Sequence, residues 1–370
     1  MELGIAREDL LKAVGRTLGI VEKKSTMPIL SNVLLEAGED GVVRVTATDL
    51  EVGISDSCEA EVSKAGSVTI SAKSLYDVLR NLPPDPVKIV REDGDWVQLS
   101  CGAVRFRLVG LPVEDYPAFP ALDEVKFIKL EGPQLSAMLD KVHFAISTDE
   151  TRYSLNGVFI RVVDGHLLMV ATDGHRLCKV EQSVDIKAKS GLDRGLILPR
   201  KGILELRKLL EDADVQVEMG IRESNCFFRI DDLVLAMRLI DGEFPDYAQV
   251  VPASFSKEAW VDRRQLVDSL KRVSVLSYDK AWGLRLEVGK KELVISSSNP
   301  NVGEARDVIP VSKYSGDPLA IGFNARYLID GLAVLPDGEI YLQFNDELLP
   351  GVVRHTDDES YLCVVMPMRI

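Results

Sequence analysis

Apolar residues recur at steps of three and four in three stretches of the chain, residues 7–19, 132–147 and 262–275. In the second stretch, Leu135, Met138 and Leu139 fall on one face of a 3.6-residue helix. The pattern predicts an amphipathic helix in each stretch. The anchoring leucines of the three stretches, Leu10, Leu135 and Leu266, lie 125 and 131 residues apart.

Three further landmarks follow each helix at a similar spacing. The turns TATDLE, VATDGH and ISSSNP align at Asp49, Asp173 and Asn299, at steps of 124 and 126 residues. A second helical pattern begins at 72, 199 and 324, and alternating apolar residues then predict closing strands in which Leu108, Leu239 and Val364 align. Self-similarity of this length indicates repeated whole domains.

The repeat predicts an α+β fold of three similar domains, each with two helices packed on β-sheets made of about eight short strands. Proline-bearing, turn-like segments near 122–126 and 252–256 separate the copies. The predicted domains are residues 1–124, 125–252 and 253–370.

Composition favours an intracellular, multidomain protein. The 370 residues are 46% hydrophobic, enough for several cores, and charged residues near the first methionine argue against a signal peptide. Apolar runs fall short of the ~20 residues of a membrane span, so we expect a cytoplasmic protein without a membrane partner. Five scattered cysteines predict reduced, mostly buried thiols, without a disulfide frame or zinc site.

Positive charge is concentrated in the predicted helices. Residues 7–17, 72–82, 132–147, 199–211, 262–275 and 324–334 together carry +6, whereas the net charge of the chain is −14 and the remainder therefore carries −20. Lys and Arg are good helix formers, so exposed helix faces explain this segregation by themselves. If the helices face one common space, they form a basic surface that binds phosphates without reading sequence.

Common catalytic and nucleotide-binding motifs are absent, and we predict neither an enzyme nor a cofactor or metal site. The string ATDGHRL places Asp173, His175 and Arg176 together. Because Asp173 aligns with Asp49, the acid is better explained as a turn residue shared by the copies. His175 and Arg176 belong to the second copy alone and fit binding better than catalysis.

The strings STMPILSNVLL, RYSLNG, ATDGHRL, PRKG, DGEFPDY, GFNARY and VVMPMRI occur in an order that resembles one family, the bacterial DNA polymerase III β subunit family of sliding clamps. The resemblance runs from the first helix to the last residues. It implies a DNA replication processivity factor, a head-to-tail homodimer that forms a closed ring around duplex DNA. It also implies partners that bind through short peptides, among them the replicative DNA polymerase and the clamp loader.

Site residues follow from the same resemblance, position by position. It implies a peptide-binding pocket at Arg152, Leu155, Thr172, Gly174, His175, Arg176, Leu177, Pro245, Val250, Asn324, Tyr327, Val364, Val365, Met366, Pro367, Met368 and Arg369. It implies DNA contacts at Lys24, Lys73, Arg80, Tyr153, Arg200, Lys201 and Lys208. It implies a ring seam that packs Phe106 of one chain against Val275 and Leu276 of the next. The chain departs from the family pattern at Ala281, Gln249 and Ser154.

Two other functions remain open on the sequence. The net charge of −14 leaves room for a peptide-binding scaffold that does not encircle DNA. The string ATDGHRL leaves room for an enzyme centred on Asp173, His175 and Arg176.

Overall fold

The computed structural model describes residues 1–22, 26–184, 191–211, 215–277 and 282–369, which form two compact units. The first unit comprises Met1–Pro133 and Lys201–Leu239, and the second comprises Gln134–Arg200 and Ile240–Ile370. None of the helices within the described ranges has the length and apolarity that crossing a bilayer requires.

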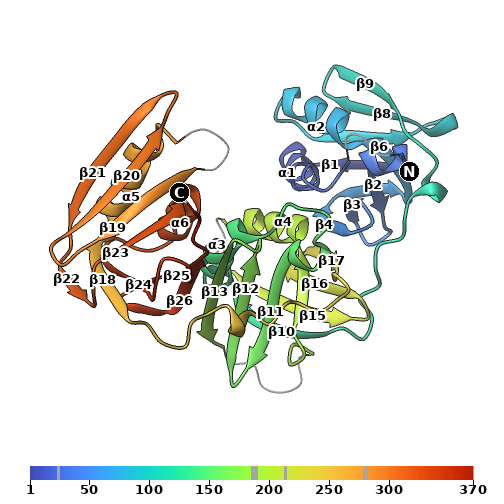
Figure 1. Ribbon diagram of the computed structural model, residues 1–370. Coiled ribbons are helices and arrows are strands. Elements are labelled where there is room, and N and C mark those ends of the chain that lie inside the picture. Colours follow the sequence, from blue (N-terminus) through green and yellow to red (C-terminus); the bar gives the residue numbers. More distant parts are fainter. Residues whose placement is uncertain (23–25, 185–190, 212–214, 278–281, 370) are drawn as a thin grey trace. The chain divides into compact units, whose positions relative to one another are not determined.

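Two antiparallel sheets form the first unit (Figure 1). A five-stranded sheet has the order β5-β1-β7-β8-β9 and an eight-stranded sheet the order β10-β15-β16-β17-β4-β3-β2-β6. The strands are β1 (Glu2–Ile5), β2 (Asn32–Ala37), β3 (Val42–Thr48), β4 (Val52–Glu59), β5 (Glu61–Lys64), β6 (Gly66–Ser71), β7 (Val87–Arg91), β8 (Trp96–Cys101), β9 (Val104–Val109), β10 (Lys126–Glu131), β15 (Gln216–Arg222), β16 (Asn225–Ile230) and β17 (Leu233–Arg238).

Two further antiparallel sheets form the second unit. The larger has nine strands in the order β14-β11-β12-β13-β26-β25-β24-β18-β22, and the smaller has the order β21-β20-β19-β23. The strands are β11 (Gly157–Val163), β12 (His166–Thr172), β13 (Arg176–Ser183), β14 (Leu196–Pro199), β18 (Lys257–Asp262), β19 (Gly283–Val288), β20 (Glu292–Asn299), β21 (Gly303–Pro310), β22 (Lys313–Ser315), β23 (Leu319–Asn324), β24 (Glu339–Phe344), β25 (Gly351–His355) and β26 (Asp358–Val365).

All six predicted helices are confirmed. They are α1 (Arg7–Thr17), α2 (Ala72–Asn81), α3 (Gly132–Val142), α4 (Arg200–Leu210), α5 (Arg263–Ser274) and α6 (Ala325–Ala333). Helix α1 packs against α2, and α5 packs against α6. Asp262 and Asn324 cap α5 and α6 by accepting hydrogen bonds from first-turn backbone N–H groups. The prediction of an α+β fold with repeated two-helix domains is therefore confirmed.

The same side-chain contacts recur in different copies of the repeat. Arg7, the first residue of α1, donates from Nη1 to the carbonyl oxygen of Leu79 at the end of α2, at 3.4 Å. Arg263, the first residue of α5, donates from Nη1 to the carbonyl oxygen of Leu332 in α6, also at 3.4 Å. A cation at a helix C-terminus is favoured by the helix dipole, so this arginine ties the two helices of the first and third copies together.

The copies are joined by ladders with matching register. Strand β17 pairs with β4 so that Met237 lies opposite Val52, and β26 pairs with β13 so that Val365 lies opposite Arg176. These ladders equate Met237 with Val365. The alignment of Leu239 with Val364 predicted from the apolar pattern is wrong, because alternation alone leaves a strand free to slip along its partner.

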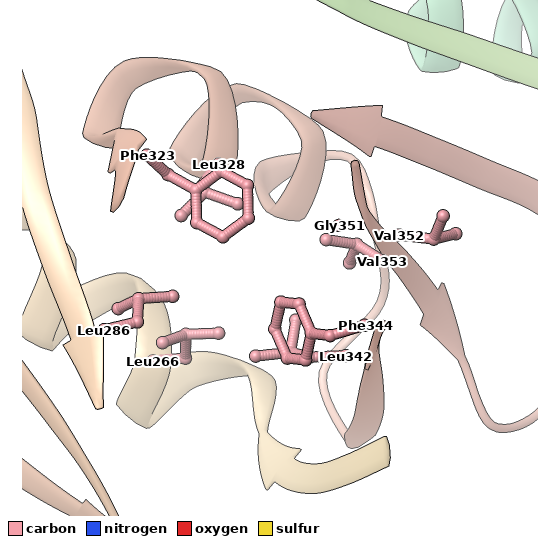
Figure 2. A pocket seen from close by; sticks show the side chains of 9 residues that line it. All are labelled: Leu266, Leu286, Phe323, Leu328, Leu342, Phe344, Gly351, Val352 and Val353. Carbon is pink, nitrogen blue, oxygen red and sulfur yellow. The ribbon is translucent and has the colours of Figure 1, made fainter. Parts of the chain in front are cut away.

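The core of the third copy is packed by apolar side chains from one helix pair and its sheets. Figure 2 shows nine residues around a small enclosed cavity of about 10 Å³. They are Leu266, Leu286, Phe323, Leu328, Leu342, Phe344, Gly351, Val352 and Val353. Gly351 is required here, because a Cβ atom would lie 2.7 Å from Cζ of Phe323. A cavity of this size holds at most one water molecule.

Candidate functional site

An apolar groove of about 190 Å³ lies in the second unit. Its floor comes from β13 and β26, where Leu177 and Val364 face each other in the ladder. The lining residues are Leu155, Thr172, Gly174, Arg176, Leu177, Phe244, Pro245, Tyr247, Val250, Val364 and Met366. A concave, mostly apolar site with a few polar groups at its edge is typical of a ligand or peptide site.

Nine residues of the predicted pocket line this groove: Leu155, Thr172, Gly174, Arg176, Leu177, Pro245, Val250, Val364 and Met366. The other eight lie outside the lining: Arg152, His175, Asn324, Tyr327, Val365, Pro367, Met368 and Arg369. Some of these support it from nearby. The ring of His175 stacks on that of Tyr327, with centroids 6.3 Å apart. The backbone N–H of Met366 donates to the carbonyl of His175 at 2.8 Å, which continues the β13–β26 ladder.

Two lining residues, Phe244 and Tyr247, are absent from the predicted pocket. Their rings lie against Phe159 of β11, at centroid distances of 5.1 and 6.1 Å. Both belong to the segment between the second and third copies, and both pack on the cluster that includes Leu177 and Val364. The sequence places these aromatics beside a turn, but only the path of the segment brings them to the groove.

Arg176 lies at the edge of the groove with 9% of its surface exposed, and it contacts several neighbouring residues. Its Nε donates to Asp173 Oδ2 at 3.1 Å and its Nη1 to Asp330 Oδ2 at 2.6 Å. Its Nη2 donates to the carbonyl of Phe144 at 2.5 Å, and the guanidinium lies 4.6 Å from the Tyr327 ring centroid. These contacts fix the wall of the groove.

Arg176 is held in its charged form by this environment. Burial by itself lowers the pKa of the guanidinium, but the hydrogen bond to Asp330 and the charges of Asp173 and Asp330 outweigh burial and raise that pKa above its ordinary value.

Asp173 forms a turn, as predicted. Its Oδ1 accepts the backbone N–H groups of His175 and Arg176 at 2.9 and 3.0 Å. Asp49 does the same for Glu51 and Val52, at 2.9 and 2.7 Å. The carboxylate of Asp173 therefore has a structural role shared between copies. Among the residues with a described position, no group of three or more His, Cys, Asp and Glu side chains could hold a metal ion.

Cys178 and Cys363 face each other beneath the groove, in the β13–β26 ladder. Their Sγ atoms are 3.3 Å apart and both residues are buried. Burial, followed by the hydrogen bond to Cys363, raises the pKa of the Cys178 thiol. All five cysteines are free in the structure and all but Cys58 are buried, so the prediction of mostly buried thiols is confirmed.

The six candidate DNA-contact residues that the structure describes lie on three elements. Lys73 and Arg80 are exposed on α2, and Arg200 is exposed at the start of α4. Tyr153 is 55% exposed in a short 3-10 helix, Tyr153–Leu155. Lys24 lies outside the described residues.

The other two candidates have acidic neighbours within the first unit. Lys201 Nζ pairs with Asp49 Oδ2 and donates to the carbonyl of Ile20 at 2.7 Å. Lys208 Nζ pairs with Glu205 Oε1 at 2.7 Å while its side chain stays 60% exposed. Lys201 is therefore anchored in place, whereas Lys208 can reach outward.

Two of the three candidate seam residues are exposed apolar side chains. Phe106 is 38% exposed on β9, and Val275, at the end of α5, is 66% exposed. Leu276 is partly buried. Strand β9 is the edge of its sheet, as β21 is of its own. Exposed edge strands that carry apolar side chains are ready to pair with another chain.

The three departures from the family pattern have different surroundings. Gln249 donates from Nε2 to Asp246 Oδ2 at 3.0 Å within a short turn. Ser154 lies beside Tyr153 in the 3-10 helix. Ala281 lies outside the described residues.

Comparison with known proteins gives consistent matches along the whole chain. Models of the DNA polymerase III beta subunit match in order, the N-terminal domain at residues 1–120, the central domain at 129–246 and the C-terminal domain at 248–369. The beta sliding clamp of Caulobacter vibrioides is 35% identical over 376 residues, which cover 100% of both chains.

Solved structures give the same result. The crystal structure of the DNA polymerase III subunit beta from Pseudomonas aeruginosa has a TM-score of 0.94 and 34% identity, with 100% of both chains covered. The sliding clamp of Bartonella birtlesii bound to griselimycin has a TM-score of 0.94 and 34% identity at the same coverage.

Proposed function

The chain belongs to the DNA polymerase III beta subunit family of sliding clamps, and from this premise we propose that two copies close head to tail into a ring around duplex DNA. The ring tethers the replicative polymerase to its template and has no catalytic role of its own. The observation that carries this proposal is that β9 and β21 are edge strands: within the part of the chain that the structure describes, each has one neighbouring strand where its counterpart has two.

The repeat identifies these counterparts. The backbone N–H of Gly110 donates to the carbonyl of Asp95, and that of Leu239 donates to the carbonyl of Ser224, both at 2.8 Å. The shared contact equates β9 with β17, which pairs with β4. An ion pair similarly equates β21 with β4, because Arg272 bonds Asp307 at 2.6 Å as Arg16 bonds Asp56 at 2.7 Å.

Because β17 pairs with β4, the repeat predicts that their counterparts, β9 and β21, pair with each other. We propose that this pairing forms between two copies of the chain. The interface is heterologous, and such an interface closes into a ring when the rotation per subunit permits it.

Burial at matching positions supports this seam. In β17, Leu233 and Leu235 are buried. Their counterparts in β9 are Val104 and Phe106, and each is 38% exposed. Exposed apolar side chains at positions that are buried in another copy of the repeat indicate a surface that another chain covers. Val275 and Leu276, at the end of α5, supply a matching apolar patch.

DNA contacts in this proposal come from exposed basic residues of the helices. Lys73, Arg80, Arg200 and Lys208 reach phosphates; Lys24, which lies outside the described residues, is a contact that the family resemblance implies. The anchored ammonium of Lys201 adds positive charge at the start of α4. Contacts to phosphates carry no sequence information, so the ring slides freely while topology prevents escape.

The groove in the second unit receives short peptides of the polymerase, the clamp loader and other partners. Its apolar floor suits leucine and phenylalanine anchors, and its polar edge fixes their direction. Of the family positions outside the lining, His175, Tyr327 and the tail residues Pro367, Met368 and Arg369 border it in this proposal.

The domain boundaries in this proposal remain those of the sequence, after residues 124 and 252; the family matches meet between residues 120 and 129 and between 246 and 248. The proposal places the protein in the cytoplasm, where its DNA and polymerase partners are.

Seam substitution tests the ring directly. Phe106→Asp puts a charge where a buried apolar side chain is needed, so we expect sedimentation to report monomers. Val163→Asp is the matched control, because Val163 is an exposed apolar residue of a different strand, β11. Phe106→Asp that stays dimeric at micromolar concentration would contradict the proposed seam.

A further inference from the structure

The ladders that join the copies reveal a counterpart of the groove in the first unit. Leu177 lies opposite Val364 at the groove floor, and Gly53 lies opposite Ala236 in the β4–β17 ladder. The next strands agree, because Val352 pairs with Val364 as Phe227 pairs with Ala236. The floor of the groove therefore exists twice in the chain.

A phenylalanine of the chain itself covers the first floor. A Cβ atom at Gly53 would lie 3.0 Å from Cε2 of the Phe119 ring. Phe119 packs on a buried cluster formed by Phe227, Val234 and Ala236. The glycine is needed because any side chain at this position presses against the ring.

The segment that follows β9 and the segment that follows β17 begin with similar packing and then differ. Tyr116 packs in a cluster with Leu34, and Phe244 stacks on Phe159. Leu34 and Phe159 are themselves counterparts. Leu34 lies opposite Thr46, three residues before Asp49, and Phe159 lies opposite Val170, three residues before Asp173.

Three positions later, Phe119 corresponds to Tyr247. Tyr247 stands in the wall of the open groove, whereas Phe119 lies on the floor. One segment therefore borders its groove and the other fills it.

We propose that Phe119 is an internal ligand that closes a second peptide groove in each chain. The ring takes the place that a partner's aromatic or leucine anchor takes in the open groove. This inference rests on the proposed function, because it assumes that the open groove receives peptides. It explains why, within the described residues, the floor formed by β13 and β26 is open whereas its counterpart formed by β4 and β17 is covered, and it predicts that removing the ring opens the second floor.

Calorimetry with a short synthetic peptide ending in Leu-Phe tests the proposal. Met366→Arg fills the open groove, and we expect it to reduce binding to the baseline. In that background Phe119→Ala restores binding at one peptide per chain. Phe127→Ala is the matched control, because Phe127 packs on the same cluster and does not lie on Gly53. We expect no restored binding there.

A second variant guards against collapse of the vacated space. Leu50 is the counterpart of the groove residue Gly174, and both have positive φ, 79° and 87°. A triple variant that adds Leu50→Gly to Phe119→Ala and Met366→Arg therefore gives the vacated floor the same glycine that lines the open groove.

The failures of the two ideas are distinguishable. Failure of the unsubstituted protein to bind the peptide contradicts the peptide role of the open groove. The internal-ligand proposal is overturned by a different result: the unsubstituted protein binds the peptide, both Phe119 variants give only the baseline signal, and circular dichroism shows that these variants keep a native fold.

Discussion

Removing the carboxylate of Asp330 tests whether Arg176 holds the wall of the groove. Asp330→Ala deletes the 2.6 Å hydrogen bond from Arg176 Nη1 and leaves the guanidinium with Asp173 and the Phe144 carbonyl. A hydrogen bond to a charged group contributes about 1.5–3 kcal/mol. Because the Asp330 side chain is 29% exposed, water reaches the vacated edge. We therefore expect a loss near the lower end, about 2 kcal/mol.

Hydrogen exchange measures this loss locally, which matters because a chain of several domains does not unfold in one step. A decrease of about 2 kcal/mol in opening free energy makes the amides of the β13–β26 ladder exchange about 30-fold faster. Peptide affinity falls in parallel, since the groove wall is less ordered. Asp337→Ala is the control, because its carboxylate pairs with Arg263 at an exposed site. Unchanged exchange in Asp330→Ala would refute the role given to Arg176.

Three further changes have definite expected outcomes. Leu266→Ala enlarges the cavity of the third copy and lowers the local opening free energy by about 2–5 kcal/mol, measured by hydrogen exchange of the amides of α5. Partial burial opposes ionisation of Asp358, but hydrogen bonds from Lys141 and Ser360 keep the pKa of its carboxyl below the ordinary value. The ionised carboxylate therefore contributes stability to the fold above pH ~4, and this contribution is lost as the pH falls through the lower folded pKa. Asp358→Asn removes this pH dependence from acid unfolding curves. Arg200→Gln reduces the slope of log K for DNA against log salt concentration by about 0.9, whereas an unchanged slope excludes a phosphate contact there.

Local patterns predicted the elements well. The apolar steps in residues 262–275 reflect a helix that buries one face, and α5 spans Arg263–Ser274. The shared turn at Asp49 and Asp173 was also predictable, because an aspartate that accepts the next backbone N–H groups needs only its own neighbours.

Contacts between distant segments could not be predicted in this way. Arg176 and Asp330 lie 154 residues apart, and the local pattern around Arg176 resembles a binding or catalytic string instead. The register of the closing strands was also misplaced, because Leu239 and Met237 are both apolar and only the ladder distinguishes them. Phe244 and Tyr247 needed the path of the connecting segment before they could be assigned to the groove.

Retention on DNA tests the central claim most directly. The purified protein is loaded by a bacterial clamp loader with ATP onto nicked circular DNA, and the bound fraction is measured by gel filtration before and after a single restriction cut. A closed ring without base contacts stays on the circle and slides off the linear ends. We predict retention before the cut and loss after it. Equal retention on both forms would contradict encirclement.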